Sequence, residues 1–246
     1  MLRIGRIPYL NCEPFFAHLG GVELLSLTPR RLGEATAAGQ VDAAPLSLMD
    51  QLRLEADLVP LPFGIANHGP VKSVLLFSRR PPGELAGAAV AVTDETSTSV
   101  EILRVLLHAK HKAPPARWVG PGDPADAVLL IGDQAIRTAT SAHGWPHVMD
   151  LAQEWVEWTG GPCVFARWAI RRAVPPAERE AFAAALEAAL ARGLADLPAI
   201  ARRRADTGFT AAQVIDYLSG FAYRFGPREE RAIAELRRRR AQLDPA

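Results

Sequence analysis

The side chains of this 246-residue chain that could act on a ligand are mostly neutral hydrogen-bonding groups. Asn11 follows an expected short strand near the N-terminus, and Ser73 lies within the apolar segment 71–77. An Asn amide can donate and accept hydrogen bonds without carrying a charge, and a buried Ser needs a polar partner. Each also has a structural interpretation, because Asn11 could stabilise a turn beside Pro8 and Ser73 could bond neighbouring backbone. The functional interpretation makes both residues candidates for a small-ligand site.

A run of hydroxyl residues precedes the helix that we expect at 100–107. Its members are Thr96, Ser97, Thr98 and Ser99. Hydroxyls and unpaired backbone N–H groups at a helix N-terminus form a site for anions, so a carboxylate or a phosphate would fit. The alternative is N-capping by Ser97 or Thr98, with Glu101 completing a capping box. One hydroxyl residue is enough for a cap, and the run of four therefore favours ligand binding.

Two further candidates follow an expected strand and a chain break. Asp133 comes after Gly132 at the end of the apolar strand expected at 127–131. There it could orient a substrate hydroxyl or cap the next helix. Thr159 and Gly160 lie in a glycine-containing break, where the backbone could approach a ligand closely or form a plain loop. These grounds alone leave both roles open at each position.

The order of the predicted elements indicates an α/β fold. Strands are expected near 2–7, 22–27 and 41–46 with helices between them, which is typical of a parallel sheet with crossover helices. The last third of the chain reads as helices. In one of them, apolar residues recur every four positions from Phe182 to Leu194.

The α/β pattern is interrupted by Pro-Pro-Gly at 81–83 and by a second break at 158–162. We therefore predict a two-lobed, type II periplasmic-binding-protein-like fold with two hinge-crossing strands. The first lobe is expected to hold 1–79 and 168–246, and the inserted second lobe 80–167. In such folds the ligand lies in the cleft between the lobes, at the carboxyl ends of strands.

Composition and motifs argue against several classes of function. The formal net charge is +1, so no global basic field points to nucleic acid or to an anionic membrane. Cys12 and Cys163 are too few for a disulfide framework or a zinc knuckle, and the six His residues lack a metal-site spacing. The N-terminus lacks a secretory signal pattern, and no run of about 18 apolar residues could span a membrane. We expect a cytoplasmic monomer or homodimer that acts on a small molecule without metal or cofactor.

Six segments together resemble one family, the chorismate dehydratases of the futalosine route to menaquinone, over nearly the whole chain. They read GRIPYLNCEPFF (5–16), VDAAPLSLMD (41–50), GPVKSVLLFS (69–78), TSTSVEILRVLL (96–107), DAVLLIGDQAI (126–136) and EWVEWTGGPCVFARW (154–168). The turn at 97–99 departs from the family's usual Ser-Arg-Thr-Ser by lacking the Arg, so this chain lacks any contact made by that Arg. Gly161 and Cys163 stand where the family has Leu and Phe, a gentler change.

The resemblance implies that the chain removes water from chorismate to give 3-((1-carboxyvinyl)oxy)benzoate. Aromatisation of the ring supplies the driving force, so the enzyme mainly binds and orients, and the substrate's own side-chain carboxylate serves as the base. The family's catalytic Asn and Ser fall on Asn11 and Ser73. The residues implied to contact the substrate are Tyr9, Ser47, Ser97, Thr98, Ser99, Asp133, Thr159 and Gly160.

Three alternatives differ from this interpretation in checkable ways. The sister family, 1,4-dihydroxy-6-naphthoate synthase, opens with a Cys-Pro-Asn-Asp type of loop and uses a His, whereas this chain has Pro-Tyr-Leu-Asn at 8–11. A non-catalytic carboxylate-binding protein that feeds a transporter would carry a signal peptide. A ligand-sensing regulator domain would follow a helix-turn-helix segment. The sequence favours the dehydratase over all three.

Overall fold

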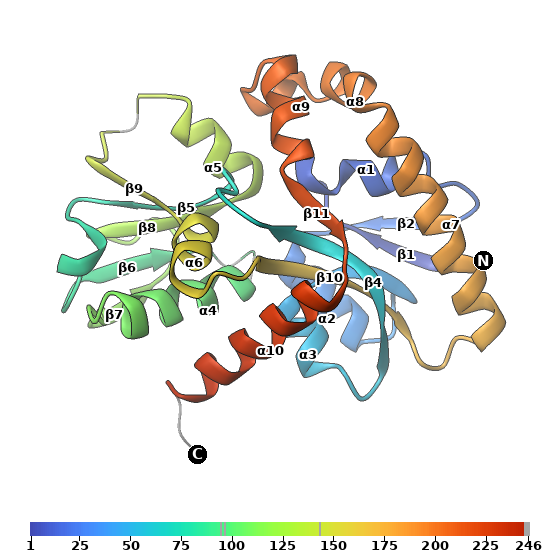
Figure 1. Cartoon of the computed structure of the whole chain (residues 1–246), viewed down its shortest axis with the longest axis horizontal. Coiled ribbons are helices and arrows are strands. Elements are labelled where there is room, and N and C mark those ends of the chain that lie inside the picture. The colour runs from blue at the N-terminus through green and yellow to red at the C-terminus, as the bar shows by residue number, and fades with distance from the viewer. Residues whose placement is uncertain (94, 96, 143, 244–246) are drawn as a thin grey trace.

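The structure of the chain is a computed structural model that describes residues 1–93, 95, 97–142 and 144–243. Its strands form two sheets, which lie beside each other along the long axis of the molecule (Figure 1). The first sheet has the order β11-β4-β10-β3-β1-β2. Its strands are β1 (Arg3–Arg6), β2 (Glu23–Ser26), β3 (Ala43–Ser47), β4 (Leu58–Asn67), β10 (Cys163–Arg171) and β11 (Phe221–Arg224).

The second sheet has the order β7-β6-β8-β5-β9. Its strands are β5 (Val74–Ser78), β6 (Ala89–Val92), β7 (Arg117–Val119), β8 (Ala127–Ile131) and β9 (His147–Asp150). We call the first sheet with the residues up to 67 and from 163 onward the first half, and residues 74–159 the second half. The segments 68–73 and 160–162 connect the two halves.

Helices follow most strands, as the sequence pattern predicts. The short helices of the first half are η1 (Leu10–Cys12), α1 (Glu13–Phe16), α2 (Pro29–Ala37), α3 (Leu48–Arg53) and η4 (Ala205–Thr207). Its C-terminal helices are α7 (Pro176–Ala195), α8 (Leu197–Arg203), α9 (Ala211–Ser219) and α10 (Pro227–Ala241). The second half contains η2 (Pro82–Glu84), α4 (Thr98–Val105), η3 (Leu106–Lys110), α5 (Gly132–Ala139) and α6 (Leu151–Thr159).

The opening strands form the parallel arrangement that the sequence predicts. β1 pairs in parallel with both β2 and β3, and every residue of β3 is buried, as expected for a strand covered on both faces. The second sheet combines parallel pairs of β6 with antiparallel pairs of β5. The carboxyl ends of β1 and β3 therefore lead into helices at one edge of the first sheet.

The long strands β4 and β10 lie side by side and connect to the second half (Figure 1). They pair antiparallel, from Cys163 opposite Asn67 to Arg171 opposite Leu58. The predicted boundary after 79 would place β5 in the first lobe, whereas β5 belongs to the second sheet, and the predicted boundary after 167 falls within β10, which belongs to the first sheet. Both crossing segments adjoin strands that are mostly apolar, β5 and β10, and only strand pairing decides which sheet such a strand joins.

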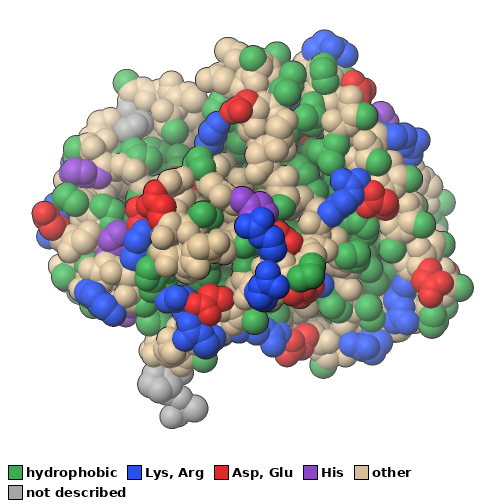
Figure 2. All heavy atoms as spheres, viewed as in Figure 1, with side chains coloured by type: hydrophobic (Ala, Val, Ile, Leu, Met, Phe, Trp, Pro, Cys, Tyr) green, Lys and Arg blue, Asp and Glu red, His purple; other side chains and the backbone are tan. Residues whose placement is uncertain are grey.

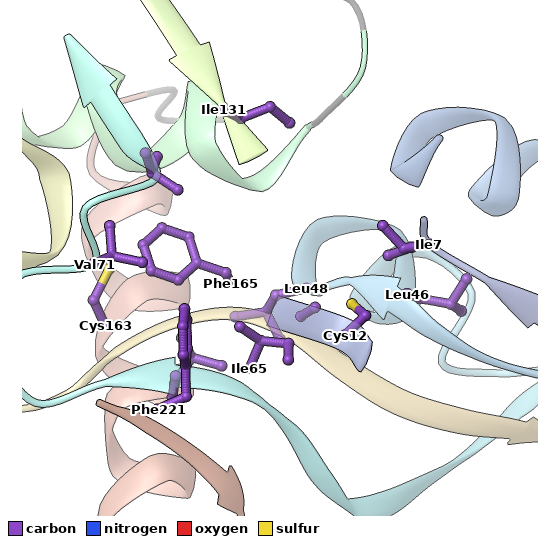
Figure 3. Close-up of a cluster of buried hydrophobic side chains, with 14 of the residues drawn as sticks. Ile7, Cys12, Leu46, Leu48, Ile65, Val71, Ile131, Cys163, Phe165 and Phe221 are labelled. Carbon is purple, nitrogen blue, oxygen red and sulfur yellow. The ribbon is translucent and has the colours of Figure 1, made fainter. Parts of the chain in front are cut away.

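One cluster of buried apolar side chains runs through both halves. Trp168 on β10 is fully buried, and its ring lies 5.5 Å from that of Phe15 and 5.9 Å from that of Phe182. The predicted period in the long C-terminal helix is confirmed, since α7 buries Phe182, Leu186 and Leu190. Figure 3 shows that apolar side chains from both halves, including Ile65, converge between the sheets.

Acidic and basic side chains are interspersed over the face of the molecule in Figure 2, in keeping with the near-zero net charge. Within the described ranges, no helix has the length and apolar character that crossing a bilayer requires.

Candidate functional site

A cavity lies between the two halves. Its polar lining is formed by Tyr9, Asn11, Cys12, Ser47, Ser73 and Ser99. Apolar walls come from side chains such as Ile65, Ile131 and Phe165, which are labelled in Figure 3. The structure thus brings five of the predicted site residues together in one cavity, although they are up to 90 positions apart in the chain.

Four helices direct their N-terminal ends toward this cavity. The lining residues at or next to these ends are Pro29, the first residue of α2; Ser47, the N-cap of α3; Ser99, the second residue of α4; and Gly132, the first residue of α5. The first N–H groups of a helix have no partner within it, and the helix dipole adds partial positive charge at that end. No side chain among the described lining residues is charged. The cavity is therefore suited to an anion held by neutral donors.

Asn11 lies in η1, the turn that follows β1. Its amide oxygen Oδ1 is buried and has no hydrogen-bond partner among the described residues. A buried polar atom left without a partner costs free energy comparable to a lost hydrogen bond. Since Asn11 lines the cavity, a ligand there would supply the partner that the folded chain does not.

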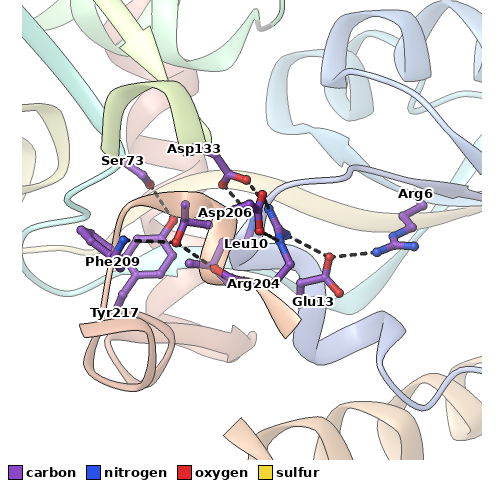
Figure 4. Close-up of polar contacts among 10 residues, drawn as sticks. Arg6, Leu10, Glu13, Ser73, Asp133, Arg204, Asp206, Phe209 and Tyr217 are labelled. Carbon is purple, nitrogen blue, oxygen red and sulfur yellow. Dashed lines mark hydrogen bonds and ion pairs between the residues drawn. The ribbon is translucent and has the colours of Figure 1, made fainter. Parts of the chain in front are cut away.

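Ser73 stands at the end of the first crossing segment and is fully buried. Its Oγ accepts a hydrogen bond of 2.8 Å from the hydroxyl of Tyr217 on α9, as Figure 4 shows. Burial raises the pKa of Tyr217, so its phenol stays protonated and remains a donor. Because Tyr217 occupies an acceptor position on Oγ, the hydrogen of Ser73 itself is free to point to another acceptor.

The backbone before Ser73 is held in an unusual conformation. Lys72 has a φ of 61°, in the left-handed region that costs free energy for a residue with a side chain. The carboxylate of Asp150 compensates, because it accepts the N–H groups of Val71 at 3.1 Å and Lys72 at 2.7 Å. It also caps α6 by accepting two further backbone N–H groups. Asp150 thereby fixes where Ser73 enters the cavity wall.

A cluster that we call the hydroxyl contact joins the two halves on one side of the cavity. Ser47 Oγ and Ser97 Oγ lie 2.7 Å apart, and both donate to Asp50 Oδ2, at 2.7 Å and 3.1 Å. Thr98 Oγ1 accepts the N–H of Met49 at 3.1 Å. Of the predicted hydroxyl run, Ser99 lines the cavity and Ser97 and Thr98 contact α3. Thr96 lies outside the described residues.

Tyr9 closes the cavity next to the hydroxyl run. Its hydroxyl donates to Glu95 Oε2 of the second half at 2.5 Å, and burial raises its pKa. Its ring lies against Gly132, where an added Cβ would come within 3.0 Å of the ring. Gly132 also has a φ of +57°, so this position needs glycine both for its conformation and for the close approach of Tyr9.

A second cluster, the charged contact, joins the halves on the side of α5 (Figure 4). Asp133 Oδ1 accepts the N–H of Leu10 at 3.1 Å, and Oδ2 accepts a hydrogen bond from Arg204. Arg204 also bonds Glu13 Oε1 at 3.1 Å. Asp133 is not among the residues that line the cavity, and both of its oxygens are occupied by protein donors.

The structure places Thr159 and Gly160 away from Asn11 and Ser73. They line a separate hollow against α10, together with residues such as Arg228. Thr159 Oγ1 donates to the carbonyl of Trp155 at 2.9 Å, and Gly160 ends α6 with a φ of +71°. Their local role is therefore to terminate α6, and the cavity forms without them.

Sequence reasoning missed Arg204, Tyr217 and Glu95, which contact predicted site residues. Tyr217 does fall on the buried face of α9 beside Val214. That spacing predicts burial and the need for a partner, yet a partner 144 positions away leaves no local signal. Among the described residues, no group of three or more His, Cys, Asp or Glu side chains is arranged to hold a metal ion.

A family model described as menaquinone biosynthesis matches residues 2–242 of the chain. This chain belongs to that family. The match confirms the resemblance that the six segments indicate. Among curated relatives of this menaquinone biosynthesis protein, the chorismate dehydratase of Thermus thermophilus is 33% identical over an alignment 242 positions long, and the match covers 89% of this chain and 88% of that protein.

Solved structures confirm the predicted periplasmic-binding-protein-like fold. A crystal structure of a protein from Archaeoglobus fulgidus has a TM-score of 0.80 at 16% identity and covers 98% of this chain and 97% of its own. The periplasmic aliphatic sulphonate binding protein of Escherichia coli has a TM-score of 0.67 at 18% identity, with 98% of this chain and 85% of its own covered. At these identities the likeness concerns the fold alone.

Proposed function

We propose that this chain is a chorismate dehydratase, a lyase that converts chorismate into 3-((1-carboxyvinyl)oxy)benzoate and water. The observation that carries the proposal is the cavity shared by the unpartnered amide oxygen of Asn11 and the hydroxyl of Ser73. The relative of that name and the membership of the menaquinone biosynthesis family support it.

The reaction needs little acid–base machinery from the protein. The ring carbon that carries the enolpyruvyl ether loses a proton, and the neighbouring carbon loses its hydroxyl group. The electron pair of the broken C–H bond completes the aromatic ring. The described lining contains no carboxylate or His, and burial raises the pKa of Cys12, which keeps it a neutral thiol. We therefore assign the base to the substrate's own side-chain carboxylate, which acts through proximity.

Asn11 and Ser73 have complementary roles in this proposal. The hydrogen of Ser73, left free by the hydrogen bond from Tyr217, is directed at the oxygen of the departing hydroxyl group. The amide of Asn11 accepts from or donates to the polar groups around the reacting carbons and so orients the ring. Neither residue gains or loses a charge, which fits a site that mainly selects the reactive conformation.

The two carboxylates of chorismate require positive potential inside the cavity. The N-terminal ends of α2, α4 and α5 supply it through their helix dipoles and through first-turn N–H groups other than those of Arg30 and Gly132, which donate to the carbonyls of Glu95 and Ser73. The apolar walls formed by Ile65, Ile131 and Phe165 exclude water, and a low local dielectric strengthens each of these interactions. The turn at 97–99 lacks the Arg usual in the family, and in this account the helix ends take over the role of a cation.

Incubation of the purified protein with chorismate tests the proposal, with the aromatic product followed by absorbance and mass spectrometry. Asn11→Ala and Ser73→Ala should each lower kcat by about 100-fold or more, the scale seen when one oriented hydrogen-bonding group is removed from an active site. Ser219→Ala on the exposed end of α9 removes a hydroxyl outside the cavity and should leave turnover unchanged. Normal turnover by both cavity variants would contradict the assigned site.

We also propose that the activity is cytoplasmic and requires neither a metal nor a cofactor. Treatment of the protein with a chelator, followed by gel filtration, should leave the rate of chorismate conversion unchanged. A rate that falls and returns on addition of a divalent cation would contradict this part of the proposal.

A further inference from the structure

We infer that Arg204 is a positioning residue that closes the second half onto the turn carrying Asn11. The effect that we expect of Arg204 on the kinetics rests on the proposed function. Its effect on the arrangement of the two halves can be measured without any substrate.

Arg204 follows α8 in the first half and lies between acidic groups of both halves (Figure 4). Its guanidinium bonds Asp133 of the second half, Glu13 Oε1 at 3.1 Å and Asp206 Oδ1 at 3.0 Å. The side chains of Arg204, Asp133 and Glu13 are only 14%, 11% and 9% exposed. Glu13 is bonded in turn by Arg6 at 2.8 Å. Buried charges alternate in sign across the boundary between the halves.

The partners of Arg204 bracket the turn that carries Asn11. Asp133 accepts the N–H of Leu10, the residue before Asn11, at 3.1 Å. Glu13, two residues after Asn11, is the first residue of α1. Asp133 is also the second residue of α5, and Gly132 before it lines the cavity. A single guanidinium therefore links the turn, the start of α1 and the cavity wall of the second half.

Loss of Arg204 should shift the molecule toward an open arrangement. With the halves together, Asp133 would then be a poorly hydrated carboxylate without its cation, and Glu13 would keep only its bond from Arg6. A buried charge that loses its partner is strongly unfavourable, and separation of the halves would return Asp133 to water. Arg204 thus favours the closed arrangement by removing this penalty.

Small-angle X-ray scattering of the full chain without chorismate tests the structural part. Arg204→Met should increase the radius of gyration relative to the wild type. Arg224→Met breaks an exposed ion pair with Glu187 within the first half and should leave it unchanged. If Arg204→Met does not fold by circular dichroism, Arg204→Lys, which keeps the charge with fewer donors, should give a smaller increase. A radius equal to that of the wild type in the folded variant would overturn the inference.

Kinetics with chorismate separate this role from a direct role in the reaction. A protein that is closed only part of the time binds its ligand more weakly in proportion, so Arg204→Met should raise KM by about tenfold or more. Saturating chorismate closes the halves again, so kcat should stay within about threefold of the wild type. Arg204→Lys should have a KM between those of the wild type and Arg204→Met. A loss confined to kcat would overturn the inference. Absence of turnover in the wild type would instead contradict the proposed function, and the scattering result would still decide the role of Arg204.

Discussion

The charged contact and the hydroxyl contact do the same task with different chemistry. Each holds the N-terminal end of a second-half helix, α5 or α4, against the first half beside the cavity. The charged contact relies on Arg204 between carboxylates from both halves. The hydroxyl contact relies on Ser47 and Ser97 around one carboxylate, Asp50, which already pairs with Arg53 of its own helix.

The difference concerns what happens when a contact separates. Hydroxyls that lose a protein partner bond water at little net cost, whereas a charge buried without its partner is heavily penalised. The charged contact should therefore define one closed geometry, and the hydroxyl contact should tolerate small movements of the halves. Four predictions test this comparison, from the largest expected effect to the smallest.

Asp133→Ala should have the largest effect. It removes the buried partner of Arg204 and the acceptor of the Leu10 N–H together, so the free energy of unfolding should fall by about 3 kcal/mol. Urea denaturation measures it. Glu187→Ala, which breaks the exposed pair with Arg224, is the matched control and should cost less than about 1 kcal/mol. Equal losses for the two variants would remove the distinction between buried and exposed charge on which the comparison rests.

Tyr217→Phe should lower kcat roughly tenfold and leave KM near the wild-type value. One neutral hydrogen bond of 2.8 Å to Ser73 is lost, and about 1.4 kcal/mol of lost orientation corresponds to a factor of ten. Steady-state kinetics with chorismate provides the measurement. A raised KM with unchanged kcat would place Tyr217 with Arg204 as a residue that acts on closure.

Ser97→Ala should change the free energy of unfolding by less than about 1 kcal/mol and KM by less than about twofold. Ser47 Oγ still donates to Asp50 at 2.7 Å when the second hydroxyl is gone. The same denaturation and kinetic assays apply. An effect as large as that of Asp133→Ala would show that the hydroxyl contact, too, fixes the closed geometry.

The smallest effect concerns Asp206, a carboxylate at the exposed edge of the charged contact. The guanidinium of Arg204 hydrogen-bonds it and lowers its pKa below the ordinary value of 3.8. A lowered pKa contributes stability that is present above the ordinary value and is lost as the pH falls through the folded-state pKa. Because the side chain is 61% exposed, this contribution should be only a few tenths of a kcal/mol.

An NMR titration of Asp206 should give a pKa below 3.8 in the wild type and a value closer to 3.8 in Arg204→Met. An Asp206 pKa that is the same in the wild type and in Arg204→Met would show that Arg204 does not lower it.

Local sequence signals predict the elements and half of the site. Asn11 lies in the turn η1 after β1, and Ser47 is the last residue of β3. The carboxyl ends of parallel strands meet at one edge of a sheet, so the convergence of the two residues follows from topology. Arg204 lies 71 positions from Asp133, and no local pattern marks such a pair. The expected contribution of Thr159 rests on a glycine-rich break, which in the folded chain ends α6 facing α10. A glycine-rich break predicts where the chain turns, but it does not predict which residues the turn will contact.

A crystal structure of Ser73→Ala with chorismate bound tests the central claim most directly. We predict that the ring lies in the cavity against Phe165 with Asn11 Oδ1 bonded to it, and that the carboxylates face the N-terminal ends of α2, α4 or α5. Chorismate held outside the cavity by Arg or Lys side chains, with Asn11 Oδ1 still unpartnered, would contradict the account.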